Sequence, residues 1–135
     1  MKSSDKERLL REANLAKVHS YSPYSKFRVG ASVILKNGEV ISGANVENAS
    51  YPCSICAERN VLSTVYGKGY RKEDIVAMAL SSDTKDFIYP CGMCAQVIGE
   101  LMDPDSNIYL INAKGEVKEI KVRKITPYQF SLGGK

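Results

Sequence analysis

The apolar positions near the start of the chain follow a helical period. Leu9, Ala13 and Ala16 recur four and three residues apart, with Leu10 beside them, and charged residues take most of the other positions. This spacing predicts an amphipathic helix that covers the core with one apolar stripe. A serine at position 4 and a glutamate at position 7 match a capping box, so we expect the helix to start there and to end near residue 19.

Two strand-like segments follow a polar break at residues 21–25, which contains Pro23. Residues 27–36 and 40–45 are rich in β-branched side chains, which favour strands. Asn37-Gly38 between them is typical of a two-residue hairpin turn. This part of the sequence therefore predicts an antiparallel hairpin.

The second half of the chain alternates between helix and strand patterns. A second helix starts at residue 53 or 56, ends near residue 66 before two glycines, and buries Ala57, Val61, Leu62 and Val65. The apolar run at 75–80 predicts a buried strand, and Pro90 precedes a third helix over 91–102. The short turn between strands expected at 107–112 and 117–122 favours an antiparallel pair.

This order of elements predicts an α/β fold, a three-layer α/β/α sandwich around a five-stranded mixed sheet. The second and third helices each connect successive strands, so right-handed crossovers should place them side by side with their N-termini together. A length of 135 residues suits one core. We expect a single domain over residues 1–135 and a partly mobile tail at 131–135.

Composition and charge argue against several classes of protein. Lys and Arg number 19 against 15 Asp and Glu, a net charge of +4, and no basic block concentrates it, which argues against a nucleic-acid partner. No apolar run approaches the roughly 20 residues that span a bilayer, and the N-terminus lacks an apolar signal core. We therefore expect a cytoplasmic protein that binds neither nucleic acid nor membrane, and whose cysteines are metal ligands or free thiols.

The four cysteines form two Cys-x2-Cys pairs, Cys53 with Cys56 and Cys91 with Cys94. A catalytic zinc site uses three protein ligands and leaves the fourth position open to water. Cys91 and Cys94 at one helix start, and Cys56 at the neighbouring start, can supply those three. A closed structural site of all four thiolates is the alternative. The single histidine, His19, ends a different helix, and we do not expect it to be a ligand.

Two charged residues beside Cys56 carry further chemistry. Zn2+ with three thiolates has a formal charge of −1, so Arg59 and the two positive helix N-termini would compensate the sulfurs. Glu58 lies two residues after Cys56, where a carboxylate could take a proton from water and pass it on. The alternative for either side chain is an ordinary place on a helix surface.

The two cysteine segments resemble a known family. Cys56-Ala57-Glu58 with Pro90-Cys91-Gly-Met-Cys94 is similar to the three-cysteine form of the zinc-deaminase signature. Further segments resemble the small cytidine deaminases that act on free nucleosides, from about residue 21 to 130. They are Tyr21-Ser-Pro-Tyr-Ser-Lys-Phe27, Val29-Gly30-Ala31, Asn45-Val-Glu47-Asn48-Ala49 and Gln96.

The resemblance implies one zinc ion per chain and hydrolytic deamination of cytidine or 2′-deoxycytidine to uridine or 2′-deoxyuridine plus ammonia. Zinc-bound hydroxide would attack C4 of cytosine, while Glu58 would protonate N3 and then the departing amino group. The backbone carbonyl of Tyr89 would accept from that amine, and backbone groups near Cys56 and Ala57 would hold the pyrimidine edge.

The resemblance also implies how the nucleoside is bound. Phe27 would pack on the base, and Asn45 and Glu47 would bind the ribose 3′-hydroxyl. A carboxylate there would repel a 3′-phosphate, so polynucleotide substrates are disfavoured. Ala49, Tyr51 and Phe130 would reach into a neighbouring subunit's site, so the expected assembly is a homotetramer with shared sites.

The sequence departs from the family pattern at two positions. Ala95 follows the last zinc cysteine where the family usually has arginine, and Cys53 is a cysteine that the family does not require. The first removes a charge beside the thiolates and leaves more of the compensation to Arg59. A deaminase of a modified cytosine nucleoside antibiotic, similar to blasticidin S, shares the signature and is the alternative function.

Overall fold

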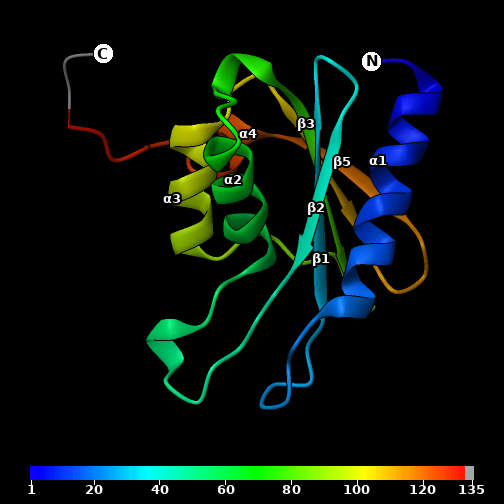
Figure 1. Ribbon diagram of the computed structural model, residues 1–135, viewed down its shortest axis with the longest axis vertical. Coiled ribbons are helices and arrows are strands. Elements are labelled where there is room, and N and C mark those ends of the chain that lie inside the picture. The colour runs from blue at the N-terminus through cyan, green and yellow to red at the C-terminus, as the bar shows by residue number, and fades with distance from the viewer. Residues whose placement is uncertain (133–135) are drawn as a thin grey trace.

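The computed structural model describes residues 1–132 and has three layers (Figure 1). Helix α1 (Ser3–Ala16) covers one face of a five-stranded sheet, and helices α2 (Ala57–Gly67) and α3 (Gly92–Leu101) lie side by side on the other, next to the short helix α4 (Val122–Ile125). The predicted α/β/α sandwich is therefore confirmed.

The sheet is mixed, with the strand order β2-β1-β3-β4-β5. Strand β1 pairs antiparallel with β2 and β3, β3 pairs parallel with β4, and β4 pairs antiparallel with β5. The strands span Val29–Leu35 (β1), Val40–Ala44 (β2), Ile75–Ser82 (β3), Asn107–Ile111 (β4) and Val117–Lys121 (β5). Both predicted antiparallel hairpins are present, and helix α3 makes the crossover between the parallel pair.

The turn between β1 and β2 differs from the predicted one. The Leu35 amide donates to the Glu39 carbonyl at 2.9 Å and the Gly38 amide donates to the Leu35 carbonyl at 2.9 Å, so three residues form the loop. A two-residue turn of type I′ needs positive φ at both central residues, but only Gly38 has it, at 91°. The side chain of Asn37 instead accepts from the Glu39 amide at 2.9 Å, which stabilises the longer turn.

Several helix ends also differ from the sequence prediction. Helix α1 begins at Ser3 after Lys2, and within residues 1–132 no side chain caps it, so the predicted capping box is wrong. Residues 17–19 form a separate 3-10 turn, as do Tyr51–Cys53 before helix α2. Helix α4 was not predicted, because a helix of four residues is too short to show a helical period.

Two apolar clusters fill the space on either side of the sheet. The cluster under α1 contains Leu9 and Ala13, and the one under α2 and α3 contains Val61, Leu62 and Val65. These residues belong to the stripes that the helical periods predicted. The packing places the N-termini of α2 and α3 at one end of the molecule, as the crossover argument requires.

Helix α1 and the turn after it approach strand β1 closely at Gly30. A Cβ atom there would lie 2.2 Å from the Ala13 carbonyl oxygen and 2.5 Å from the Lys17 amide nitrogen. Backbone atoms cannot move aside as a flexible side chain can, so we expect Gly30→Ala to lower the free energy of unfolding by about 1–3 kcal/mol. Urea unfolding in saturating zinc measures this.

Gly67→Ala provides the matched control for that substitution. A Cβ atom at Gly67 would meet nothing within 4 Å, so its effect should stay within about 1 kcal/mol. Equal effects of the two substitutions would contradict the close approach of α1 to β1.

No helix within residues 1–132 is long and apolar enough to cross a membrane. The expectation of one domain over residues 1–135 stays a prediction. Of the tail predicted to be mobile, residues 131–135, the last three lie outside the described residues.

Candidate active site and metal centre

Three cysteine sulfurs meet where helices α2 and α3 begin. The Sγ atoms of Cys56, Cys91 and Cys94 all lie within 4.8 Å of one another. Cys56 and Cys91 are the N-cap residues of α2 and α3, and the Cys94 amide donates to Cys91 Sγ at 3.5 Å. Zinc bonds thiolates at about 2.3 Å, which places tetrahedral sulfurs about 3.8 Å apart, so a small contraction would let this cluster hold one zinc ion.

Two further candidate ligands lie outside this cluster. Cys53 is exposed at the end of one 3-10 turn, and His19 is exposed at the end of the 3-10 turn that follows α1. Neither belongs to the group of potential ligands found among residues 1–132. The arrangement of three sulfurs favours a site with an open position over the closed four-thiolate alternative.

Two of the sulfurs, those of Cys56 and Cys94, share a proton, and Arg59 places a positive charge beside Cys56. The Cys94 thiol donates to Cys56, which, with help from Arg59, lowers the pKa of Cys56 to about 5. The same hydrogen bond, together with burial, raises the pKa of Cys94. Arg59 Nη2 lies 4.0 Å from Cys56 Sγ and also donates to the Ser54 carbonyl at 3.1 Å. Because a bound metal needs thiolates, its binding would displace the shared proton.

Glu58 is a buried carboxyl in the first turn of α2, and its side chain is only 6% exposed. Burial raises the pKa of Glu58 to about 7, and the negative charge of Cys56 adds to the shift. A cation held by the three sulfurs would offset part of this rise in the pKa of Glu58. A carboxyl that titrates near neutral pH can both accept and release a proton during a reaction.

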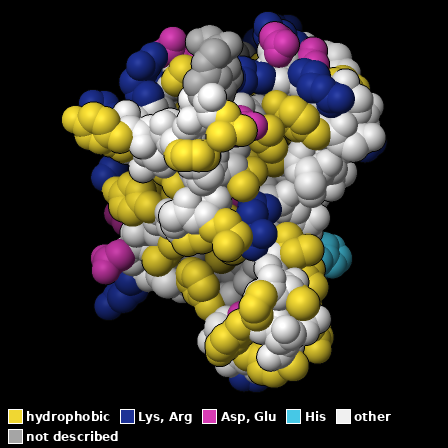
Figure 2. Space-filling view, turned by 90° about the vertical axis from the view of Figure 1, so that its left-hand side faces the viewer, with side chains coloured by type: hydrophobic (Ala, Val, Ile, Leu, Met, Phe, Trp, Pro, Cys, Tyr) yellow, Lys and Arg dark blue, Asp and Glu magenta, His cyan; other side chains and the backbone are white. Residues whose placement is uncertain are grey.

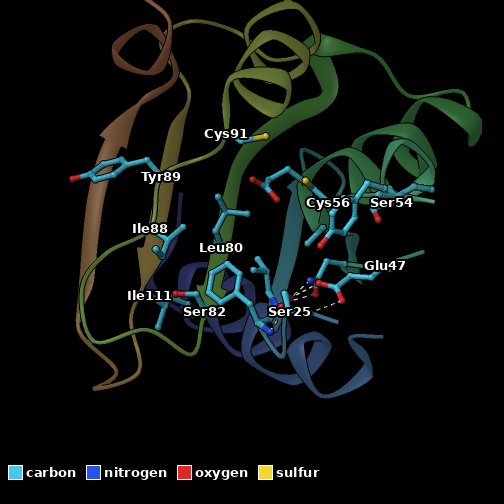
Figure 3. A pocket seen from close by; sticks show the side chains of 17 residues that line it. Ser25, Glu47, Ser54, Cys56, Leu80, Ser82, Ile88, Tyr89, Cys91 and Ile111 are labelled. Atoms are coloured by element: carbon cyan, nitrogen blue, oxygen red, sulfur yellow. Dashed lines mark hydrogen bonds between the residues drawn. The ribbon is translucent and has the colours of Figure 1, made fainter. Parts of the chain in front are cut away.

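A cavity of about 380 Å³ opens beside the sulfurs, and Figure 3 shows its lining. Its polar side chains include two carboxylates, Glu47 and Glu58, whereas no Lys or Arg in the described part of the chain lines it. The lining consists of Ser25, Phe27, Val29, Asn45, Glu47, Tyr51, Ser54, Ile55, Cys56, Ala57, Glu58, Leu80, Ser82, Ile88, Tyr89, Cys91 and Ile111.

The cavity brings together most of the residues that the sequence proposed. Those lining it are Phe27, Asn45, Glu47, Tyr51, Cys56, Ala57, Glu58, Tyr89 and Cys91. Cys94 is fully buried and does not line the cavity. The side chain of Tyr89 points away from Cys56 and Cys91 (Figure 3). Ala49 and Phe130 are exposed and do not belong to the lining of this chain's own cavity.

Asn45 and Glu47 are both engaged with the loop that precedes β1. Asn45 Oδ1 accepts from the Val29 amide at 3.0 Å, and Asn45 Nδ2 donates to the Phe27 carbonyl at 2.9 Å. Glu47 Oε1 accepts from the Tyr24 and Ser25 amides at 3.0 and 3.1 Å. The Ser25 hydroxyl donates to Glu47 Oε2 and holds the pKa of that carboxyl below its usual range. Both side chains therefore stabilise the cavity wall itself.

Sequence reasoning missed the floor of the cavity, which Leu80, Ser82 and Ile111 form. Leu80 and Ser82 lie at the end of β3, and Ile111 ends the parallel strand β4. Ligands of open α/β sheets bind outside the carboxyl ends of the parallel strands, so the ends of the strands predicted at 75–80 and 107–112 could have pointed to these residues.

The C-terminal segment lies across helix α3. Gln129 Nε2 donates to the Gln96 carbonyl at 3.0 Å, and Gln96 Nε2 donates to the Phe130 carbonyl at 3.2 Å. A Cβ atom at Gly99 would lie 2.1 Å from Gln129 Oε1, so this glycine makes room for the Gln129 side chain. Phe130 is held at the surface, 66% exposed.

Comparisons with known proteins agree with this geometry. Residues 3–110 match the family model described as the cytidine and deoxycytidylate deaminase zinc-binding region. The chain is 46% identical to a cytidine deaminase of Halalkalibacterium halodurans, over 94% of this chain and 95% of the relative. It is 39% identical to a cytidine deaminase of Sporosarcina psychrophila, over 94% and 92%.

The fold has a close counterpart among solved structures. The crystal structure of cytidine deaminase from Burkholderia pseudomallei superimposes with a TM-score of 0.89 at 38% identity, covering 96% of this chain and 100% of the other. Fold, cysteine cluster and sequence similarity lead to the same conclusion. The chain belongs to the zinc-binding cytidine and deoxycytidylate deaminase family.

Proposed function

We propose that this chain deaminates cytidine and 2′-deoxycytidine hydrolytically, giving uridine or 2′-deoxyuridine and ammonia. The observation that carries the proposal is the position of Glu58. Its buried carboxyl lines the cavity in the same helical turn as Cys56, one of three sulfurs suited to a zinc ion. A proton carrier and a metal centre therefore share one wall of a cavity open to a small molecule.

Glu58 moves two protons in the proposed reaction. It takes a proton from the water that adds to C4 and delivers it to N3, and it then carries the second proton to the exocyclic amine, which leaves as ammonia. The zinc ion that Cys56, Cys91 and Cys94 would hold supplies Lewis acidity toward that water. Arg59 lies beside Cys56 and compensates the negative charge of the sulfurs.

The remaining lining residues suit the parts of a nucleoside. Phe27 offers an aromatic face to the base, and Glu47 Oε2, which accepts one hydrogen bond from Ser25, retains capacity for the ribose 3′-hydroxyl. Asn45 contributes its second Nδ2 hydrogen to the same hydroxyl. The backbone of Ala57 holds the pyrimidine edge, and the carbonyl of Tyr89 accepts from the leaving amine.

The charge of the cavity favours an unphosphorylated substrate. Glu47 and Glu58 line it, and no cationic side chain within residues 1–132 does so. A phosphate would meet like charge without a compensating Lys or Arg. This charge favours nucleosides as substrates within a family whose name also covers deoxycytidylate, and it disfavours nucleotides and nucleic acid.

The test is ammonia release from four compounds: cytidine, 2′-deoxycytidine, cytidine 5′-monophosphate and a bulky cytosine nucleoside antibiotic. We expect turnover of the two nucleosides, and a kcat/KM for the monophosphate at least about tenfold lower, since an unpaired charge costs more than 1.4 kcal/mol. Preference for the antibiotic would establish the alternative function, and no ammonia from any compound would refute the proposal.

The enzyme acts as a homotetramer in this proposal. Exposed apolar side chains crowd the face formed by α2, α3 and the segment projecting below them (Figure 2). Large exposed apolar patches mark interfaces, and the exposed side chains include Tyr51, Ile55, Met93 and Phe130. Ala49, Tyr51 and Phe130 would each reach toward a neighbouring site. Light scattering measures the mass of the assembly, expected at four chains.

We also place the protein in the cytoplasm. The three sulfurs bind zinc only in the reduced state, and the cysteines within residues 1–132 form no disulfide. Thiols persist in this form in a reducing compartment.

A further inference from the structure

The cavity wall that carries Phe27 belongs to a loop with an unusual backbone. Residues 22–28 form neither helix nor strand, and Lys26 has a φ of 61°, the one positive value at a non-glycine residue among residues 1–132. An L-residue pays a steric penalty in this region, so it persists only where its surroundings enforce it. Phe27 follows directly, and its position depends on whatever holds Lys26 in that conformation.

Ser25 links this loop to Glu47. Its hydroxyl donates to Glu47 Oε2 and at the same time accepts from the Phe27 amide at 3.0 Å. The Ser25 amide donates to Glu47 Oε1 at 3.1 Å. One hydroxyl therefore connects a cavity carboxylate to the backbone of Phe27, and Figure 3 shows Ser25 and Glu47 facing each other across the loop.

Asp83 binds the residue that follows Phe27 in the chain. Arg28, the next residue, donates from Nε to Asp83 Oδ2 at 2.7 Å and from Nη2 to Asp83 Oδ1 at 3.2 Å. Lys17 Nζ lies 3.1 Å from Asp83 Oδ1. A two-point contact between guanidinium and carboxylate fixes orientation as well as distance. Through Arg28 and Lys17, Asp83 joins the end of β3 to the start of β1 and to the end of α1.

We propose that Ser25 and Asp83 are positioning residues for the nucleoside, holding Phe27 at the cavity wall from its two sides. This inference rests on the proposed function. It adds two residues that hold the cavity wall in place and do not contact the reacting atoms. It implies that the Ser25 hydroxyl couples the position of Glu47, which faces the sugar, to the position of Phe27, which faces the base.

The experiment compares Ser25→Ala with Ser25→Thr and with Ser63→Ala. Ser63 is exposed on α2, and its hydroxyl donates to the Asn60 carbonyl at 3.0 Å, outside the cavity. We expect Ser25→Ala to raise the KM for cytidine about tenfold, the effect of losing one hydrogen bond to a charged group, with kcat within about twofold. Ser25→Thr keeps the hydroxyl and should restore KM, and Ser63→Ala should match wild type.

Asp83→Asn tests the second anchor independently, with Asp105→Asn as its control. Asp105 is exposed and pairs with Arg123 outside the cavity. We expect a several-fold rise in KM for Asp83→Asn alone, because the amide has a single oxygen to accept from Arg28 and carries an NH2 group in place of the second. Titration calorimetry with uridine should show the same loss of affinity in Ser25→Ala and Asp83→Asn, whereas a purely structural role would lower only the melting temperature.

Wild-type KM in both Ser25→Ala and Asp83→Asn would overturn the inference. So would an equal loss in Ser25→Thr and Ser25→Ala, because the hydroxyl would then be irrelevant. Failure of the proposed function has a different signature, which is wild-type protein that releases no ammonia from cytidine.

Discussion

We expect Glu58→Gln to abolish nearly all turnover while the protein keeps its fold, its zinc and its affinity for nucleoside. The amide has the shape of the carboxyl but cannot take a proton from water or release one to N3. General acid-base catalysis alone contributes about 10²- to 10⁴-fold, so kcat should fall by at least that factor. Ammonia release, zinc content and uridine binding measured on one preparation separate these effects.

Glu100→Gln is the matched control, since Glu100 is exposed on helix α3 and does not line the cavity. It should retain wild-type kcat. A Glu58→Gln variant with near-normal kcat would mean that another group carries the proton. Loss of zinc or of the fold in that variant would instead assign Glu58 a structural part in the metal site.

We expect Cys94→Ser to remove zinc and with it all activity. Cys94 is fully buried beside the other two sulfurs, so the hydroxyl that replaces its thiol is a far weaker zinc ligand, and water has no route to take its place. We expect well under one zinc per chain by atomic emission and no measurable ammonia release. Added zinc should not restore either quantity.

We expect the opposite result for Cys53→Ser, which should keep one zinc per chain and wild-type turnover. Cys53 is exposed and lies outside the cluster of Cys56, Cys91 and Cys94. The comparison therefore keeps the chemical change constant and varies only the position of the thiol. A Cys53→Ser variant that loses its metal would instead support a closed four-thiolate site without an open position for water.

Local patterns predicted the elements whose signals are long and periodic. The stripe of Leu9, Ala13 and Ala16 and the apolar run at the start of β3 both appear where expected, because burial of one face repeats at the period of the element. Helix ends were less predictable. The capping box at residues 4–7 does not form, and the turn at Asn37-Gly38 takes a third residue, because several local hydrogen-bond patterns of similar energy compete there.

The functional site also has parts that the sequence predicted and parts that it did not. The identity of its chemical groups was readable from the chain, since two short segments contain the thiolates, Glu58 and Arg59, and spacing within a helix start limits which of them can share a metal. The hydrogen-bond partners of Ser25 and Asp83 could not be predicted from the sequence. Their contacts with Glu47 and Arg28 join residues 22 and 55 positions apart, and no local period encodes such pairs.

The two cysteine segments and the apolar periods thus specify, without any structure, an α/β fold and a three-sulfur centre with a carboxyl beside it. The strand ends that form the floor of the cavity, and the contacts that hold Phe27, depend on the packing of helices α2 and α3 and of the loop before β1. Side chains distant in the chain meet there only because the sheet brings their elements together, and the burial that then raises the pKa of Glu58 to about 7 exists only in the folded state.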